Sequence, residues 1–215
     1  MTLVSGSSAP TRPGRGDDEP PSGRRSEANL AVYLNVDQYA VVAAACERLI
    51  PADESPGAAA AGATDYVDSL LGAFGFDPPR IWAGGPFSGR AGGEASFATF
   101  VPLDPLDELA WRTRIEGSRG RPEREWNGPV TGLQEQYDQG IAALGPDFAE
   151  LGAADQDARL DAVPAFRSLL YEHACEAMYG PPEYGGNRDL VGWRSIAFEG
   201  DVQPRGWSDA EVSEP

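Results

Sequence analysis

The sequence of 215 residues predicts an all-α fold, a single helical domain with long aromatic loops rich in glycine and proline and a disordered N-terminal tail. From about residue 31, apolar residues recur at intervals of three and four, the spacing of one helix face. No run of alternating β-branched residues predicts a strand. Proline, glycine and capping residues divide the pattern into segments of helical length.

The composition divides the chain into three parts. Residues 1–30 are rich in proline, glycine, serine and charge, so they bury too little apolar surface to offset the entropy of ordering, and a disordered tail is expected. Residues 31–208 form the helical domain, and residues 209–215 form a short C-terminal tail.

The first two helices are predicted over residues 37–50, ended by Pro51, and over residues 64–74. The hydroxyl of Thr64 is expected to cap the second helix. Their buried positions are expected to be Val42, Cys46, Leu49 and Ile50 in the first helix, and Val67, Leu70, Leu71 and Phe74 in the second.

A third helix is predicted from the cap Asp104 and from Pro105 at the first helical position, as far as Gly117. Irregular segments flank it at residues 76–103 and 117–130. They carry the aromatic residues Trp82, Phe87 and Trp126. Long loops in a compact domain are often functional, so these rings either contact a partner protein or fold back on the core.

The later helices are predicted over residues 130–144 and 163–179, with short helical pieces around Phe148 and over residues 156–162. Their inward positions are expected to be Val130, Leu133, Tyr137, Ile141, Leu144, Phe166, Leu169, Leu170, His173 and Met178.

A tight turn follows at Gly185 and Gly186, with positive φ, after Tyr184. Asn187 is expected to hydrogen-bond backbone groups and to cap a short helix over residues 188–193, from which Trp193 packs back on the domain.

Composition excludes several functions. A formal net charge of −17 opposes binding to nucleic acid and to anionic lipid. All 17 basic residues are arginine, so lysine chemistry such as Schiff-base formation has no residue to use. The two cysteines, Cys46 and Cys175, have no metal-finger spacing and are interpreted as small apolar residues, and the sequence offers no metal or cofactor ligands that form a recognisable site.

His173, the single histidine, is the only candidate base. It shares a helix face with Glu176, so an imidazole oriented by a carboxylate is one interpretation. The other is an imidazole at a helix interface that bonds a backbone group, which is favoured because no nucleophile is evident.

Arg24 and Arg25 are not followed by the apolar stretch of an export signal, and no segment has the length of a membrane span. The chain is therefore expected in the cytoplasm, with export alongside a partner left open.

Two groups of motifs resemble the gluconate 2-dehydrogenase subunit 3 family over roughly residues 36–205. Near the C-terminus these are Pro182, Tyr184, Gly185, Gly186, Asn187, Gly192 and Trp193, after His173 and a Met-Tyr-Gly sequence at residues 178–180. Near the start they are "RLIPAD" at residues 48–53 and "DYVD" at residues 65–68.

The resemblance implies an accessory subunit that stabilises, matures or escorts an FAD-dependent catalytic subunit of the glucose–methanol–choline (GMC) type, with haem c in a third, cytochrome c subunit. It implies no cofactor on this chain. The aromatic residues of the loops and the C-terminal motif are then expected to bind the partner. Two alternatives stay open: a small enzyme that uses His173 on a sugar or an alcohol-like ligand, and a helical interaction domain unrelated to redox chemistry.

Overall fold

The computed structural model describes residues 32–81 and 100–198, which fall in one compact unit. Within these residues the all-α prediction is confirmed, with seven α-helices and no strand. The α-helices are α1 (Val36–Leu49), α2 (Ala63–Leu71), α3 (Pro105–Glu116), α4 (Leu133–Leu144), α5 (Ala153–Asp161), α6 (Pro164–Tyr179) and α7 (Val191–Ser195). Five short 3-10 helices join them, at Ala73–Gly75 (η1), Pro122–Arg124 (η4), Phe148–Glu150 (η5), Pro182–Tyr184 (η6) and Arg188–Leu190 (η7).

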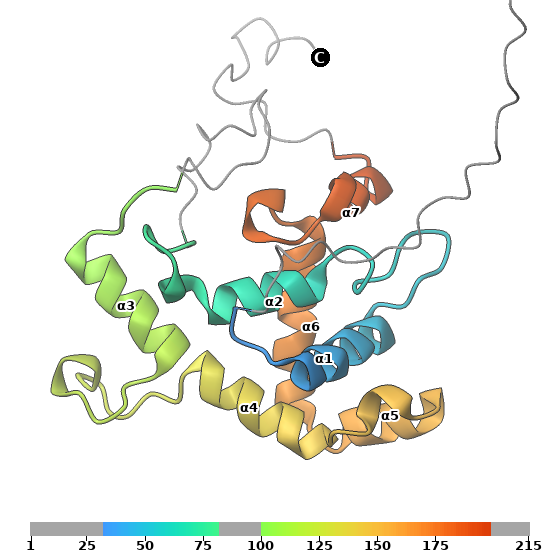
Figure 1. The fold of residues 1–215 in the computed structure, drawn as a ribbon, viewed down its shortest axis with the longest axis horizontal. Helices are drawn as coiled ribbons and strands as arrows, with labels where there is room; N and C mark the ends of the chain where they lie inside the picture. The colour runs from blue at the N-terminus through green and yellow to red at the C-terminus, as the bar shows by residue number, and fades with distance from the viewer. Residues whose placement is uncertain (1–31, 82–99, 199–215) are drawn as a thin grey trace, which may run out of the picture. The chain divides into compact units, whose positions relative to one another are not determined.

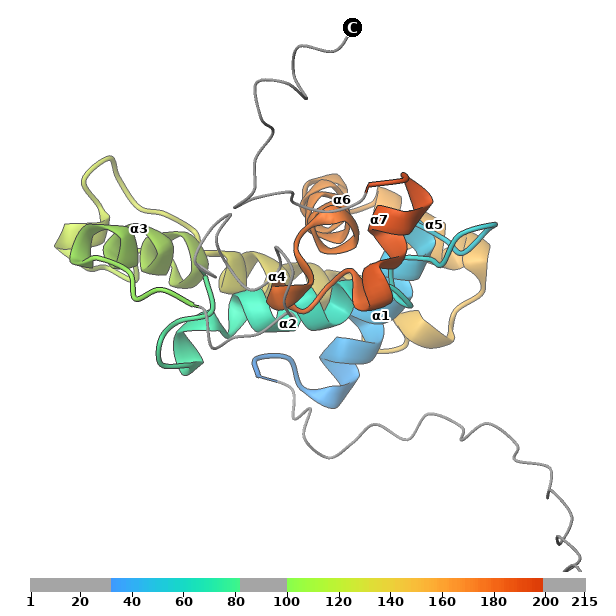
Figure 2. The same cartoon turned by 90° about the horizontal axis from the view of Figure 1, so that it is seen from above.

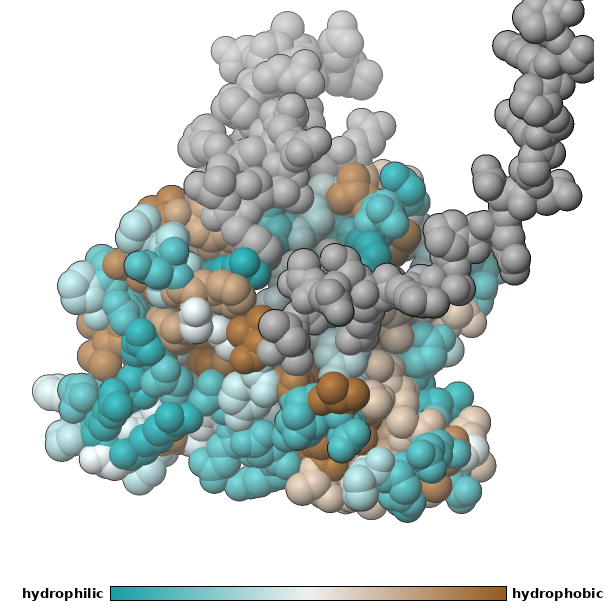
Figure 3. Space-filling view, viewed as in Figure 1, coloured by the Kyte–Doolittle hydropathy of each residue, from teal (hydrophilic) through white to brown (hydrophobic). Residues whose placement is uncertain are grey.

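The core lies where α6 crosses α1 and α2 (Figure 1). Figure 2 shows α6 nearly end-on above α2, so the two helices cross at a steep angle. Tyr137 of α4 and Phe148 of η5 are fully buried there and complete the packing from a third side. On the face in Figure 3, small hydrophobic areas lie among hydrophilic residues, as expected of an acidic chain whose large apolar side chains are mostly in the core.

Helix α1 begins one residue earlier than predicted because Asn35 and Gln38 form a capping box. The Gln38 amide donates to Asn35 Oδ1 over 2.9 Å, and the Asn35 amide donates to Gln38 Oε1 over 3.0 Å. Val42 and Cys46 are buried as expected, whereas Leu49 and Ile50 are only partly buried.

The predicted start of the second helix was wrong. The N-cap residue of α2 is Gly62, with φ of 90°, and Thr64 lies inside the helix, buried. A positive φ favours glycine, so the backbone turn fixes this start without a side-chain cap. The helix also ends earlier, at Leu71, and Phe74 belongs to η1.

Helix α3 begins as predicted, since the Asp104 carboxylate accepts from the amides of Leu106 and Asp107, both over 2.8 Å. The start predicted for the next helix was wrong, because α4 begins at Leu133 and Val130 lies before it, exposed. The piece expected over residues 156–162 begins earlier, at Ala153. Helix α6 confirms the predicted last long helix.

Candidate functional site

The C-terminal motif forms a turn that fits between α2 and α6. Gly185 has φ of 101°, which confirms the expected positive φ, and a Cβ there would lie 3.3 Å from the Asp65 carbonyl oxygen. The Arg188 amide donates to the Ala61 carbonyl over 2.9 Å, and its guanidinium pairs with the Asp65 carboxylate. The C-terminal motif therefore contacts α2, the helix that carries the "DYVD" motif.

Two motif glycines permit close backbone contact with α6. A Cβ on Gly186 would lie 2.8 Å from the Ala177 carbonyl carbon, and one on Gly192 would lie 2.7 Å from that of Met178. Neither glycine has a positive φ. The prediction of positive φ at Gly186 was therefore wrong, since this position requires glycine for lack of space.

Asn187 hydrogen-bonds backbone groups as predicted, but the prediction that it caps the helix directly after it, η7, was wrong. Asn187 is fully buried, has φ of 47°, and makes no capping bond to η7. Its Nδ2 donates to the Gly180 carbonyl over 3.1 Å, and its Oδ1 accepts from the Gly192 amide over 3.0 Å. The side chain thus links the end of α6 to α7 and satisfies two buried backbone groups.

Trp193 packs back on the domain as predicted. It is 8% exposed, and its Nε1 donates to the Tyr179 carbonyl over 2.7 Å. Phe198 meets its ring edge-to-face at 5.0 Å between centroids.

The acidic residues of "DYVD" hold distant segments against α2. Asp65 accepts from the Tyr39 hydroxyl over 2.5 Å, in addition to its pair with Arg188. Asp68 is 5% exposed and accepts three amides, from Val32, Tyr33 and Leu34, over 2.7, 2.8 and 2.7 Å. These carboxylates are therefore used as structural acceptors. The sequence did not reveal this role, because the partners of these carboxylates are 26 to 123 positions away.

Beside the turn lies a small hollow with a volume of about 130 Å³. Tyr184 lines it, and Phe100 packs edge-to-face on Tyr184 at 5.6 Å. The other lining residues described are Tyr66, Ser69, Leu70, Arg80, Ile81 and Trp111. The walls are mostly apolar and aromatic, so the hollow suits an apolar group and offers no proton-transfer pair.

His173 is 2% exposed, and its Nδ1 lies 2.8 Å from the Tyr137 hydroxyl. Burial raises the pKa of Tyr137 well above its ordinary value, so the phenol keeps its proton near neutral pH. Burial also lowers the pKa of His173, an effect that the charge of Glu176 partly opposes. The imidazole is therefore neutral near pH 7, and its Nδ1 is hydrogen-bonded to the Tyr137 hydroxyl.

Glu176 does not orient the imidazole. Its Oε2 accepts from the Tyr66 hydroxyl over 2.7 Å, and the Tyr66 ring lies edge-on to His173 at 6.5 Å. The interface role expected for His173 holds, but its hydrogen-bond partner is a tyrosine hydroxyl, not the backbone group that we expected.

Replacing His173 with glutamine should remove a pH dependence of stability. The folded-state pKa is below the ordinary value of 6.5, so the unfolded chain binds the proton more readily and stability falls as pH drops below 6.5. Urea unfolding at pH 8.0 and 5.5 checks this. The wild type should lose more stability on acidification than His173→Gln, and equal losses in the two proteins would contradict a buried neutral imidazole.

The residues expected to bind a partner fall into three groups. Trp126 is 92% exposed, whereas Gly186, Asn187 and Trp193 are buried within the domain. Pro182, Tyr184 and Gly185 are half-buried. Trp82 and Phe87 lie outside the described residues. Apart from Tyr184 at the hollow, the C-terminal motif therefore acts mainly by packing within the domain. Trp126 lies exposed on a different segment of the chain.

Across residues 32–81 and 100–198, no three histidine, cysteine, aspartate or glutamate side chains gather as metal ligands would. Cys46 is buried, and burial raises its pKa to about 12, while Cys175 is half-buried. Of the helices described, none has both the length and the apolar character needed to cross a membrane.

Comparison with known proteins gave one result. Residues 36–200 match the model of the family described as gluconate 2-dehydrogenase subunit 3. The matched range includes both groups of motif residues, the first at the end of α1 and on α2 and the second from α6 to α7. Neither the curated proteins nor the solved structures contain a significant match.

Proposed function

Since the chain belongs to the gluconate 2-dehydrogenase subunit 3 family, we propose that it is a non-catalytic accessory subunit that stabilises, matures or escorts an FAD-dependent dehydrogenase of GMC type. The family match over residues 36–200 is the observation that carries this proposal. FAD belongs to the partner, which oxidises a sugar or an alcohol, and haem c belongs to a cytochrome c subunit of the same complex.

The geometry of the polar residues supports an accessory role. The best-placed acids and the single histidine already bind other groups of the domain: Asp65 and Asp68 hold chain segments, and His173 is hydrogen-bonded to Tyr137. Each is therefore used in folding, which agrees with a protein that contributes a surface to a partner. No observation favours the alternative enzyme based on His173.

Co-expression tests the proposal. The full chain is produced together with an FAD-dependent dehydrogenase of GMC type from the same organism, and the dehydrogenase is also produced alone. We expect soluble, flavin-loaded and active dehydrogenase with the chain, and a several-fold lower yield without it. A dehydrogenase that is equally soluble, flavin-loaded and active by itself would contradict the proposal, as would dye reduction by the purified chain alone when it is given a sugar.

A further inference from the structure

The loop between α3 and α4, residues 117–132, is closed at its base. We call it the tryptophan loop. The Ser118 amide donates to the Val130 carbonyl over 2.9 Å, and the Val130 amide donates to Ser118 Oγ over 3.0 Å. Gly117 and Gly132 pack so closely that a Cβ on Gly117 would lie 2.8 Å from the Gly132 nitrogen. The two ends of the loop are thereby held together.

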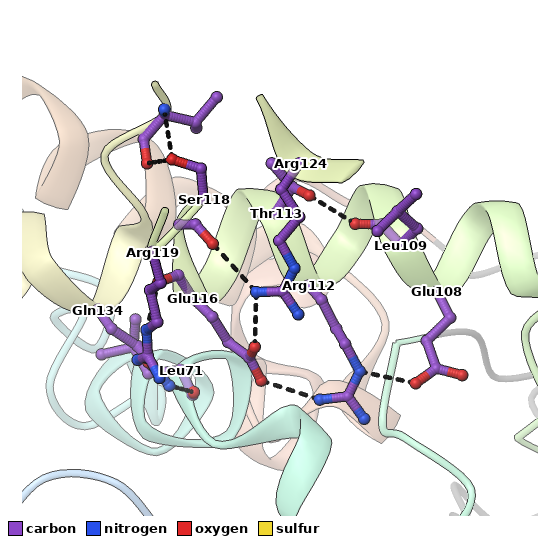
Figure 4. A network of polar contacts seen from close by, with 12 residues as sticks. Leu71, Glu108, Leu109, Arg112, Thr113, Glu116, Ser118, Arg119, Arg124 and Gln134 are labelled. Carbon is purple, nitrogen blue, oxygen red and sulfur yellow. Dashed lines mark hydrogen bonds and ion pairs between the residues drawn. The ribbon is translucent and has the colours of Figure 1, made fainter. Parts of the chain in front are cut away.

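A buried arginine fixes the interior of the tryptophan loop. The side chain of Arg124 is 2% exposed, and its Nη1 donates to Glu116 Oε2 over 2.9 Å and to the Gly117 carbonyl over 3.0 Å (Figure 4). Separating a buried ion pair leaves an uncompensated charge, so opening the loop would cost free energy and this conformation is favoured.

The same carboxylate connects the loop to α3. Glu116 Oε1 accepts from Arg112 Nη1 over 2.9 Å, and Arg112 Nε donates to Glu108 over 2.6 Å (Figure 4). The guanidinium of Arg112 also lies 4.0 Å from the centre of the Phe74 ring. Burial alone would raise the pKa of Glu116, but the hydrogen bond from Arg124 and the charges of both arginines lower it overall, so the carboxylate is ionised near neutral pH.

This ordered loop exposes a large indole. Trp126 is 92% exposed, more than any other large hydrophobic residue described, the next being Val36 at 82% and Leu106 at 74%. Full burial of such a side chain would contribute roughly 2–3 kcal/mol of favourable free energy, and the isolated domain lacks this contribution because the ring is exposed. A preorganised loop loses little conformational entropy on binding, so a partner that covers Trp126 would recover most of that free energy.

The surroundings of the loop are locally basic in an acidic chain. Residues 112–132 contain five arginines and three glutamates, a net charge of +2, whereas the whole chain carries −17. Arg114, Arg119 and Arg121 are exposed, and within the described residues none of the three has a carboxylate at ion-pair distance. Arg119 instead donates to the Glu116 carbonyl and to Gln134. Exposed arginine and tryptophan are the residue types most enriched at the centres of protein interfaces.

We propose that the tryptophan loop is a docking site for the partner flavoprotein, which inserts Trp126 into an apolar pocket whose rim carries carboxylates. The inference rests on the proposed function, because it takes the dehydrogenase as the partner. Charge selects the kind of surface: an acidic patch is repelled by the chain as a whole and attracted only at a basic site such as this one. Helix α3, of which only Ile115 is fully buried, lies directly beside the loop and extends the available surface (Figures 1 and 2).

The test measures the affinity of the purified full chain for the FAD-dependent dehydrogenase used in the co-expression test. Trp126→Ala is expected to weaken binding at least about 30-fold, the loss typical of an interface hot spot. Tyr171→Ala is the matched control, since Tyr171 is 49% exposed on α6, outside the tryptophan loop, and should bind like the wild type. Because Trp126 is so exposed, its replacement should leave the thermal unfolding midpoint unchanged.

Charge is tested separately. Arg121→Glu should weaken binding about 10-fold at low salt and less at high salt, while Arg194→Glu on α7 serves as the control. The docking site is overturned if the wild type binds but Trp126→Ala binds equally well, or if both charge reversals weaken binding to the same extent. If the wild type does not bind the dehydrogenase at all, the proposed function fails together with the docking site.

Discussion

Replacing Gly192 with alanine is expected to destabilise the folded chain by about 3 kcal/mol or more, a large effect for a single added methyl group. A Cβ there would overlap the Met178 carbonyl, with the carbonyl carbon 2.7 Å away. Helix α7 would have to move off α6, which would break the bond from the Gly192 amide to Asn187. Urea unfolding followed by circular dichroism measures the loss.

Gly75→Ala is the control for this substitution. Gly75 is exposed, and the nearest side-chain atom to an added Cβ is 3.9 Å away, so its stability should change by less than about 0.5 kcal/mol. If the two variants proved equally stable, the close contact between α6 and α7 would be disproved, and with it the steric reason for glycine in the motif.

Replacing Asp68 with alanine is expected to cost roughly 3 kcal/mol, because three amides lose an ionised acceptor at once. The amides of Val32, Tyr33 and Leu34 all point at this carboxylate, and Leu34 is 1% exposed. The segment before α1 should therefore detach from α2. Hydrogen exchange at residues 32–34 should accelerate more than exchange in α6.

Asp37→Ala provides the comparison for Asp68. Asp37 lies exposed in the first turn of α1, where its contribution through the helix dipole is below about 1 kcal/mol. A similar small cost for Asp68→Ala, with unchanged exchange at residues 32–34, would show that these amides do not depend on the carboxylate.

Local signals predicted most helices but not every boundary. Asp104 and Pro105 marked the start of α3 correctly because both act on the adjacent turn. Thr64 gave a wrong start for α2, because a residue type that often caps helices does not show whether the chain has already turned. Gly62 turns the chain two residues earlier and leaves Thr64 inside α2. Val130 continued the apolar spacing of α4, but its backbone pairs with Ser118 across the tryptophan loop.

The role of Asn187 illustrates what the candidate site needed from the structure. As a residue after two glycines it suggested a cap, but its side chain spans from Gly180 to Gly192. The glycine at position 186 is likewise required by the backbone of α6 and not by its own φ. Neither contact has a local signature, since each depends on how α7 returns to α6.

The amino-acid sequence by itself determined the helical class, the membership of the family, the exclusion of lysine chemistry and the acidic charge. Periodicity and motifs are read from residues near one another in the chain, and composition does not depend on the fold. Only the tertiary structure decided that burial keeps the single histidine neutral, that the motif acids bind backbone and arginine, and that Trp126 stands exposed on a loop held by a buried ion pair. These facts join residues far apart in the chain, whose distances are set by packing.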